Sequence, residues 1–150
     1  MTFSRAILTG VMLARMAAPA AAASPADIAA GLAPEVVQVV SGGTWDNAGK
    51  KGGYRAVLVA QAGAGGAQLY LEWLAAGTDG AAPSLVTSAP VKEINDLKLP
   101  DATLSSEFEK PNEYTVFLEP NDPTKDSGQS YTIVATTPGK YTFSLGASPE

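Results

Sequence analysis

Residues 54–74 read YRAVLVAQAGAGGAQLYLEWL, two β-prone runs on either side of a glycine-rich link. The link, Gly63-Ala-Gly-Gly66, favours a tight hairpin because glycine adopts positive φ without steric cost. Side chains in the second run alternate between two faces, and one face carries Leu69, Leu71 and Trp73. The other face carries Tyr70 and Glu72. This alternation predicts one face against the core and one toward solvent.

The first run, residues 54–62, has apolar residues on both faces from Val57 to Val59, which predicts a central strand covered on two sides. Turn-forming residues bound further β-prone stretches at 35–40, 84–91, 114–118, 130–135 and 140–145. Roughly six to eight short strands with turns between them predict an all-β fold. We expect a single antiparallel β-sandwich, immunoglobulin-like or related, with a small β-barrel as the alternative.

The first 23 residues have the features of a cleaved signal peptide. Arg5 precedes an apolar stretch, and Ala21 and Ala23 fit the small-x-small rule of a signal peptidase site. Cleavage after Ala23 places the protein in the periplasm or outside the cell, with one domain over residues 24–150. The chain has no uncharged apolar run of about eighteen residues, so we expect no stable membrane anchor.

Two details of this segment leave alternatives open. Arg15 follows the apolar stretch closely, so Met12 or Met16 is an alternative start to Met1. Arg5 and Arg15 also occur among hydroxyl residues without any acid, which is typical of an organellar transit peptide.

Beyond the segment, Ser24-Pro-Ala-Asp27 has the capping pattern of a short helix.

Outside residues 1–23 the chain contains no cysteine, histidine or methionine. Catalytic triads, thiolate zinc sites, blue-copper centres and the usual haem ligation need at least one of these side chains. The sequence therefore predicts no metal site and no cofactor. Removal of Arg5 and Arg15 with the signal peptide leaves 8 basic against 15 acidic residues, a net charge of −7. Such an acidic surface argues against nucleic acid or anionic membrane as a partner.

The strongest candidate for a binding site is the segment 42–55, which reads GGTWDNAGKKGGYR. It is no phosphate-binding Walker loop, because five residues separate Gly43 from Gly49 and Lys51 occupies the hydroxyl position. The functional interpretation of this segment is a mobile loop that draws an anionic group toward two aromatic rings. The predicted ligand-binding residues are Trp45, Lys50, Lys51, Tyr54 and Arg55. The simpler interpretation, which we favour from the sequence, is a glycine-rich turn with solvated lysines and Trp45 at the edge of the core.

Acidic residues form two further candidate groups. A hydrolase needs two carboxyl groups about 5 to 10 Å apart, and the candidates for such a pair are Glu107, Glu109, Glu113 and Asp122. Alternating charges on an edge strand are the simpler interpretation, because they prevent edge-to-edge aggregation. A second candidate is a calcium site, because the side chains of Asn121, Asp122 and Asp126 carry the oxygen atoms that calcium prefers as ligands. These lack the alternating Asp-x-Asp spacing and are typical turn formers.

These observations predict an exported, non-catalytic binding or interaction protein of the bacterial envelope. One partner class is another envelope protein that meets an unprotected strand, for which 85–91 and 141–145 are the candidates. The other is a small or polymeric ligand, a carbohydrate included, bound by the segment 42–55. A carboxylate-based hydrolase is the second alternative.

Overall fold

The computed structural model describes residues 24–61, 63, 65–121 and 129–146. The predicted signal segment and the acidic residues Asp122 and Asp126 lie outside the described residues. The chain divides into two compact units after Leu32. In the first, the described residues form the short helix α1 (Pro25–Ala30), as the capping pattern predicts.

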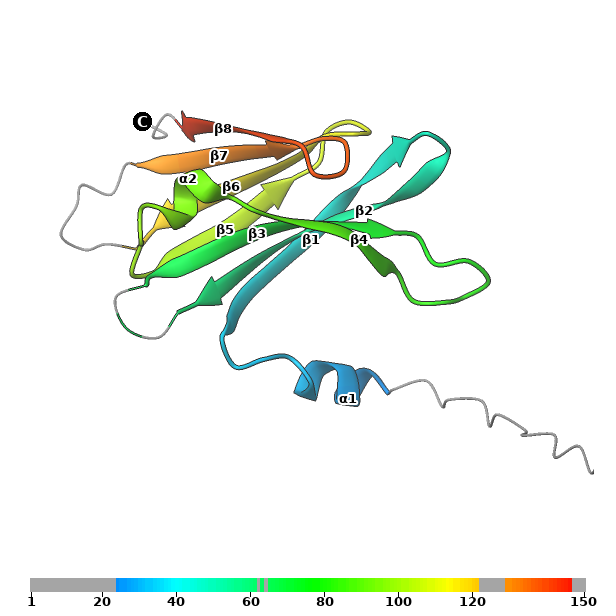
Figure 1. Cartoon of the computed structure of the whole chain (residues 1–150), viewed down its shortest axis with the longest axis horizontal. Helices are drawn as coiled ribbons and strands as arrows, with labels where there is room; N and C mark the ends of the chain where they lie inside the picture. Colours follow the sequence, from blue (N-terminus) through cyan, green and yellow to red (C-terminus); the bar gives the residue numbers. More distant parts are fainter. Residues whose placement is uncertain (1–23, 62, 64, 122–128, 147–150) are drawn as a thin grey trace, which may run out of the picture. The chain divides into compact units, whose positions relative to one another are not determined.

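The second unit contains two antiparallel sheets of four strands each (Figure 1). The first sheet has the order β1-β2-β3-β4, with the strands β1 (Val36–Asn47), β2 (Lys50–Ala60), β3 (Ala67–Ala75) and β4 (Ser84–Pro90). The second has the order β5-β6-β7-β8, with β5 (Ala102–Glu107), β6 (Tyr114–Pro120), β7 (Ser130–Ala135) and β8 (Tyr141–Gly146). The all-β prediction is confirmed.

Two finer expectations about the strands are wrong. Neither sheet closes on itself within the described residues, which excludes the small β-barrel. Each sheet is a simple up-and-down succession of consecutive strands, whereas an immunoglobulin fold interleaves strands from different parts of the chain. Within each sheet, consecutive strands are separated by two to nine residues, and strands that follow one another closely in the chain usually pair.

The hairpin predicted from residues 54–74 is confirmed, since β2 pairs with β3 over nine residue pairs. Leu69, Leu71 and Trp73 are buried, and Tyr70 and Glu72 on the other face are half-buried. The expected cover on both faces of the first run is wrong. Alternate residues of β2 from Tyr54 to Leu58 are buried, but Val57 and Val59 on the opposite face are only half-buried.

One hydrophobic core receives side chains from both sheets. The largest are Trp45, Tyr54, Leu58, Leu69, Leu71 and Trp73 from the first sheet, and Tyr114, Val116, Leu118 and Ile133 from the second. Hydrogen bonds also join the sheets. The Tyr54 hydroxyl and the Trp73 indole both donate to the carbonyl of Thr136, at 2.8 and 2.9 Å. The two buried polar tips therefore have a partner in the opposite layer.

A short helix, α2 (Lys92–Asn95), which the sequence patterns did not predict, follows β4. Its Ile94 is completely buried in the core. The side chain of Asn95 accepts a hydrogen bond from Leu69 N at 2.7 Å and donates to Leu69 O at 3.3 Å. The helix thereby continues the pairing of β3 where β4 has ended.

Candidate functional site

The segment 42–55 forms the outer end of the β1–β2 hairpin, and the expectation of a mobile loop is wrong. Asn47 pairs with Lys50, and the two residues between them, Ala48 and Gly49, have φ of 51° and 79°. Two consecutive residues with positive φ are the mark of a type I′ turn, whose twist matches that of the strands. Four glycines of this segment, at 42, 43, 52 and 53, lie in the strands. At Gly52 only glycine fits, because an added Cβ would lie 1.7 Å from Leu74 O.

A β-bulge in β1 turns Trp45 into the core. Gly42 pairs with Tyr54 and Trp45 pairs with Gly52, so two residues of β1 face one of β2. Gly43, the first of the two, has a φ of 64°. The extra residue reverses the alternation of side chains, because residues 38, 40 and 42 face inward before the bulge and residue 45 does so after it.

Both aromatic residues of the predicted site are anchored and only 2% exposed. The indole of Trp45 donates to Gly53 O at 3.0 Å. The ring of Tyr54 stacks on Tyr114 with centroids 5.4 Å apart and planes inclined by 10°. Burial, and next the charge of Glu113, raise the pKa of Tyr54 to about 12. These rings present only small parts of themselves to a ligand, so they are no open stacking platform for a sugar.

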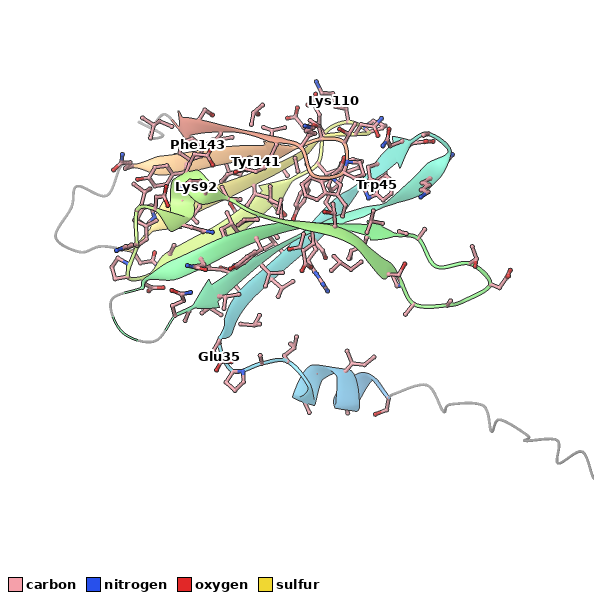
Figure 2. The ribbon with its side chains drawn as sticks, in the orientation of Figure 1. Glu35, Trp45, Lys92, Lys110, Tyr141 and Phe143 are labelled. Carbon is pink, nitrogen blue, oxygen red and sulfur yellow. The ribbon has the colours of Figure 1, made fainter. Side chains whose placement is uncertain are left out.

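A pocket of about 730 Å³ opens beside this hairpin. Its walls come from the bulged part of β1, the facing part of β2, the end of β3 and two prolines from later loops. The lining residues are Ser41, Gly42, Gly43, Thr44, Trp45, Asp46, Lys51, Gly52, Gly53, Tyr54, Leu74, Ala75, Ala76, Pro83 and Pro111. The volume falls in the range of pockets that hold small organic molecules. Figure 2 shows Trp45 on the β1–β2 hairpin that forms one wall.

Three of the five predicted ligand-binding residues line this pocket, namely Trp45, Lys51 and Tyr54. The other two lie elsewhere. Lys50 is exposed beside the turn, and Arg55 lies on the opposite face of β2, where its guanidinium donates to Glu72 at 2.6 Å. The alternation of β2 separates Arg55 from Tyr54, because neighbouring residues of a strand face opposite sides.

Charge at the pocket is balanced. The ammonium of Lys51 lies 3.3 Å from the carboxylate of Asp46, and both are exposed at the rim. The backbone N–H of Asp46 donates to the side chain of Asn112 at 2.6 Å, and Asn112 N donates to Thr44 O at 2.8 Å. These two bonds fix the outer strand of the hairpin to the loop that carries Pro111. The pocket therefore offers apolar walls and backbone groups with no unpaired charge among its lining residues.

Sequence reasoning missed the far wall of the pocket, formed by residues 74–76, Pro83 and Pro111. β3 ends at Ala75, which pairs with Gly52, and Ala76 follows directly. Pro111 comes from the loop before β6, more than 50 positions further along the chain than Gly53. No local signal marks these residues, because small apolar side chains at strand ends are common and their convergence is a property of the fold.

The acidic candidates lie at the surface. Glu107 and Glu109 are exposed, and Glu113 forms an ion pair with Lys110 at 3.0 Å. The described member of the calcium group, Asn121, donates its amide to Thr103 and Asp101. Within residues 24–121 and 129–146, as far as they are described, no group of three or more His, Cys, Asp or Glu residues could hold a metal ion.

No helix in the described part of the chain has the length and apolar character needed to cross a membrane. Comparisons with protein-family models, with curated proteins and with solved structures found no match.

Proposed function

We propose that this protein is an exported, non-catalytic binding protein of the bacterial envelope that holds a small, uncharged, apolar ligand in the pocket beside the β1–β2 hairpin. We further propose that residues 24–150 form one domain, a β-sandwich built from two up-and-down sheets. The shared core and the bonds of Tyr54 and Trp73 to Thr136 support a face-to-face arrangement of the sheets.

The observation that carries the proposal is the pocket of about 730 Å³, whose walls are formed by the segment that the sequence marks as the binding candidate. An open apolar depression on a small domain costs hydration free energy unless something covers it. The bulge at Gly43 and the anchored side chain of Trp45 also make the pocket rigid, so a ligand would bind without ordering a loop. Rigid, largely preformed apolar pockets are typical of small-molecule sites.

The charges determine the class of ligand. Lys51 is already paired with Asp46, and Arg55 with Glu72 on the other face, so the lining offers no unpaired cation for an anion. Most of the lining residues are glycine, alanine, leucine, proline or aromatic, and the polar ones are Ser41, Thr44 and the ion pair of Asp46 and Lys51. Such a lining suits a thin, largely apolar ligand. This replaces the anionic ligand expected from the lysines and arginine of the segment.

A fluorescent dye test can examine the proposal without knowledge of the natural ligand. The neutral apolar dye N-phenyl-1-naphthylamine is titrated against the mature protein, in parallel with the anionic dye 1-anilinonaphthalene-8-sulfonate. We expect the neutral dye to bind with one site and more tightly than the anionic dye. Tighter binding of the anionic dye would contradict the assignment of ligand class.

A matched pair of variants locates the site. Ala76→Trp places an indole at an exposed position that lines the pocket, and Ala60→Trp places one at an exposed position at the other end of the hairpin formed by β2 and β3. Ala76→Trp should reduce the affinity for the neutral dye at least about tenfold, a change of about 1.4 kcal/mol. Ala60→Trp should leave it unchanged. Equal affinities for the two variants would overturn the proposed site.

A further inference from the structure

The loop between β5 and β6 contributes to the far wall of the pocket through a tight turn. Glu113 N donates to Lys110 O at 3.3 Å, and Asn112 has a φ of 63°. A proline in the second place and a residue with positive φ in the third are the features of a type II turn. That proline is Pro111, which lines the pocket. Figure 2 shows Lys110, at the start of the turn, at the same end of the sheets as Trp45.

Asn112 attaches this turn to the outer edge of β1. Its backbone N–H donates to Thr44 O at 2.8 Å, and its side-chain Oδ1 accepts the N–H of Asp46 at 2.6 Å. Thr44 and Asp46 both line the pocket on the hairpin side, and Pro111 lines it on the far side. Asn112 therefore joins two walls of the pocket that come from different sheets.

The same loop touches the bulge of β1 at a second point. A Cβ added to Gly43 would lie 2.9 Å from Cδ2 of Phe108, so the Phe108 ring lies directly against the backbone of this glycine. Gly43 also lines the pocket. The loop thus contacts the hairpin through Phe108 and through Asn112, and Pro111 lies between these two residues in the chain.

We propose that Asn112 is the positioning residue that sets the width of the pocket and thereby its specificity for thin apolar molecules. This inference rests on the proposed function and adds to it the residue that selects the ligand. Movement of Pro111 away from the hairpin would stretch the bonds of Asn112 to Thr44 and Asp46, and hydrogen bonds weaken steeply once their geometry is lost.

The chemistry of asparagine suits this role. Asparagine adopts positive φ more readily than most residues, as the third place of a type II turn requires. Its Oδ1 also acts in place of a backbone carbonyl toward Asp46. A wall that is fixed before the ligand arrives favours a molecule that fits and excludes a thicker one, because the thicker one must first displace the wall.

Two substitutions separate the side-chain bond of Asn112 from the conformation of the turn. Asn112→Gly retains the positive φ but removes Oδ1, whereas Asn112→Asp retains an acceptor oxygen. Asn121→Gly is the matched control, because Asn121 follows the other end of β6. Its amide bonds to Thr103 and Asp101, and it lies outside the lining of the pocket.

The binding test compares two neutral probes of different thickness. N-phenyl-1-naphthylamine is thin, and the cage alcohol adamantanol, measured by displacement of the dye and by calorimetry, is thick. The preference for the thin probe should fall at least about tenfold in Asn112→Gly. Asn112→Asp and Asn121→Gly should keep the wild-type preference. A general loss of stability lowers both affinities by the same factor, so an unchanged preference in Asn112→Gly overturns the inference, as does an equal fall in Asn112→Asp.

Amide hydrogen exchange tests the bonds of Asn112 without a ligand. The Asp46 amide should exchange at least about tenfold faster in Asn112→Gly than in the wild type and should stay protected in Asn112→Asp. Equal exchange in the wild type and Asn112→Gly overturns the inference. A wild type that binds neither probe contradicts the proposed function and the specificity role together. Normal dye binding with an unchanged preference in Asn112→Gly contradicts the role of Asn112 alone.

Discussion

The side-chain amide of Gln38 pairs with the backbone of Leu104 as a neighbouring strand would. Gln38 Nε2 donates to Leu104 O at 2.7 Å, and Leu104 N donates to Gln38 Oε1 at 2.8 Å. One side chain of β1 thus satisfies both outward backbone groups of a residue in β5, and it joins the edges of the two sheets. Buried and partly buried backbone groups rarely lack a partner, so this pair is structural.

Replacement of Gln38 should therefore destabilise the protein. Gln38→Leu keeps a similar volume but leaves the N–H and C=O of Leu104 without their partners, which should lower the free energy of unfolding by about 1–3 kcal/mol. Gln68→Leu is the control, because Gln68 lies on a half-exposed face of β3. Its side chain accepts a hydrogen bond from the Tyr70 hydroxyl and bonds to no backbone group within the described residues. Urea unfolding of both variants measures the difference. An equal decrease in the free energy of unfolding for both variants would show that the hydrogen bonds between Gln38 and Leu104 do not stabilise the protein.

Two stacked tyrosines should respond in opposite ways to loss of the hydroxyl. Tyr54 donates to Thr136 O, whereas the buried Tyr114 hydroxyl makes no well-formed hydrogen bond within the described residues, and the nearby Ser106 side chain only partly offsets the effect of burial on its pKa. Tyr54→Phe should lower the free energy of unfolding by about 1 kcal/mol. Tyr114→Phe should leave it unchanged or raise it, because a buried hydroxyl without a partner costs free energy. Thermal unfolding of both variants decides, and a larger loss for Tyr114→Phe would contradict this account.

Alkaline pH should destabilise the protein through the same pair of rings. Burial raises the pKa of Tyr54 from 10.0 to about 12 and also raises the pKa of Tyr114. The stabilising contribution is complete below pH 10, where neither the folded nor the unfolded chain has ionised these groups. As pH rises toward 12 the unfolded chain loses its protons first, so stability falls by up to about 1.4 kcal/mol per pH unit for each group.

The wild type and Tyr54→Phe separate this effect from other titrations. The free energy of unfolding is measured from pH 8 to pH 12 for both proteins, about the range in which tyrosine ionises. The wild-type value should fall more steeply above pH 10 than that of the variant. Parallel curves would mean that Tyr54 ionises in the folded protein as it does in the unfolded chain.

The turn at the end of the β1–β2 hairpin contains a residue that can be improved. Ala48 has a φ of 51°, a conformation that asparagine and glycine tolerate better than alanine. Ala48→Asn should raise the free energy of unfolding by about 0.5–1 kcal/mol and leave dye binding unchanged. Ala81→Asn, in the exposed loop between β3 and β4, is the control and should have little effect. A loss of stability in Ala48→Asn would argue against the type I′ turn.

Local patterns predicted the parts of the fold that local residues determine. The alternation in residues 67–74 placed the two faces of β3 correctly, because side chains two apart share a face of a strand. The β-prone stretches at 130–135 and 140–145 correspond to β7 and β8. Glycines at 42, 43, 52 and 53 concealed the continuation of β1 and β2, since glycine usually weakens a strand. The close approach of Leu74 O, which requires glycine at position 52, is long-range and has no mark in the local sequence.

The candidate site was predicted in part for the same reason. Trp45, Lys51 and Tyr54 were identified by composition and do line the pocket, but the strand register carries Arg55 to the opposite face. The helix α2 was missed because its four residues are too few for a periodic signal, and it is held by Asn95 and Leu69. The binding role of the site stays a prediction until a ligand is seen in it.

The most direct test of that role follows the two tryptophans of the chain by NMR during titration with the neutral dye. Trp45 lines the pocket, whereas Trp73 is completely buried and donates to Thr136. The proposed function predicts that the indole N–H signal of Trp45 and the amide signals of Gly42, Gly43 and Gly53 shift together and saturate. The Trp73 signal should stay in place. Dye binding that leaves the Trp45 signal and these glycines unmoved would contradict the assignment of the pocket as the ligand site.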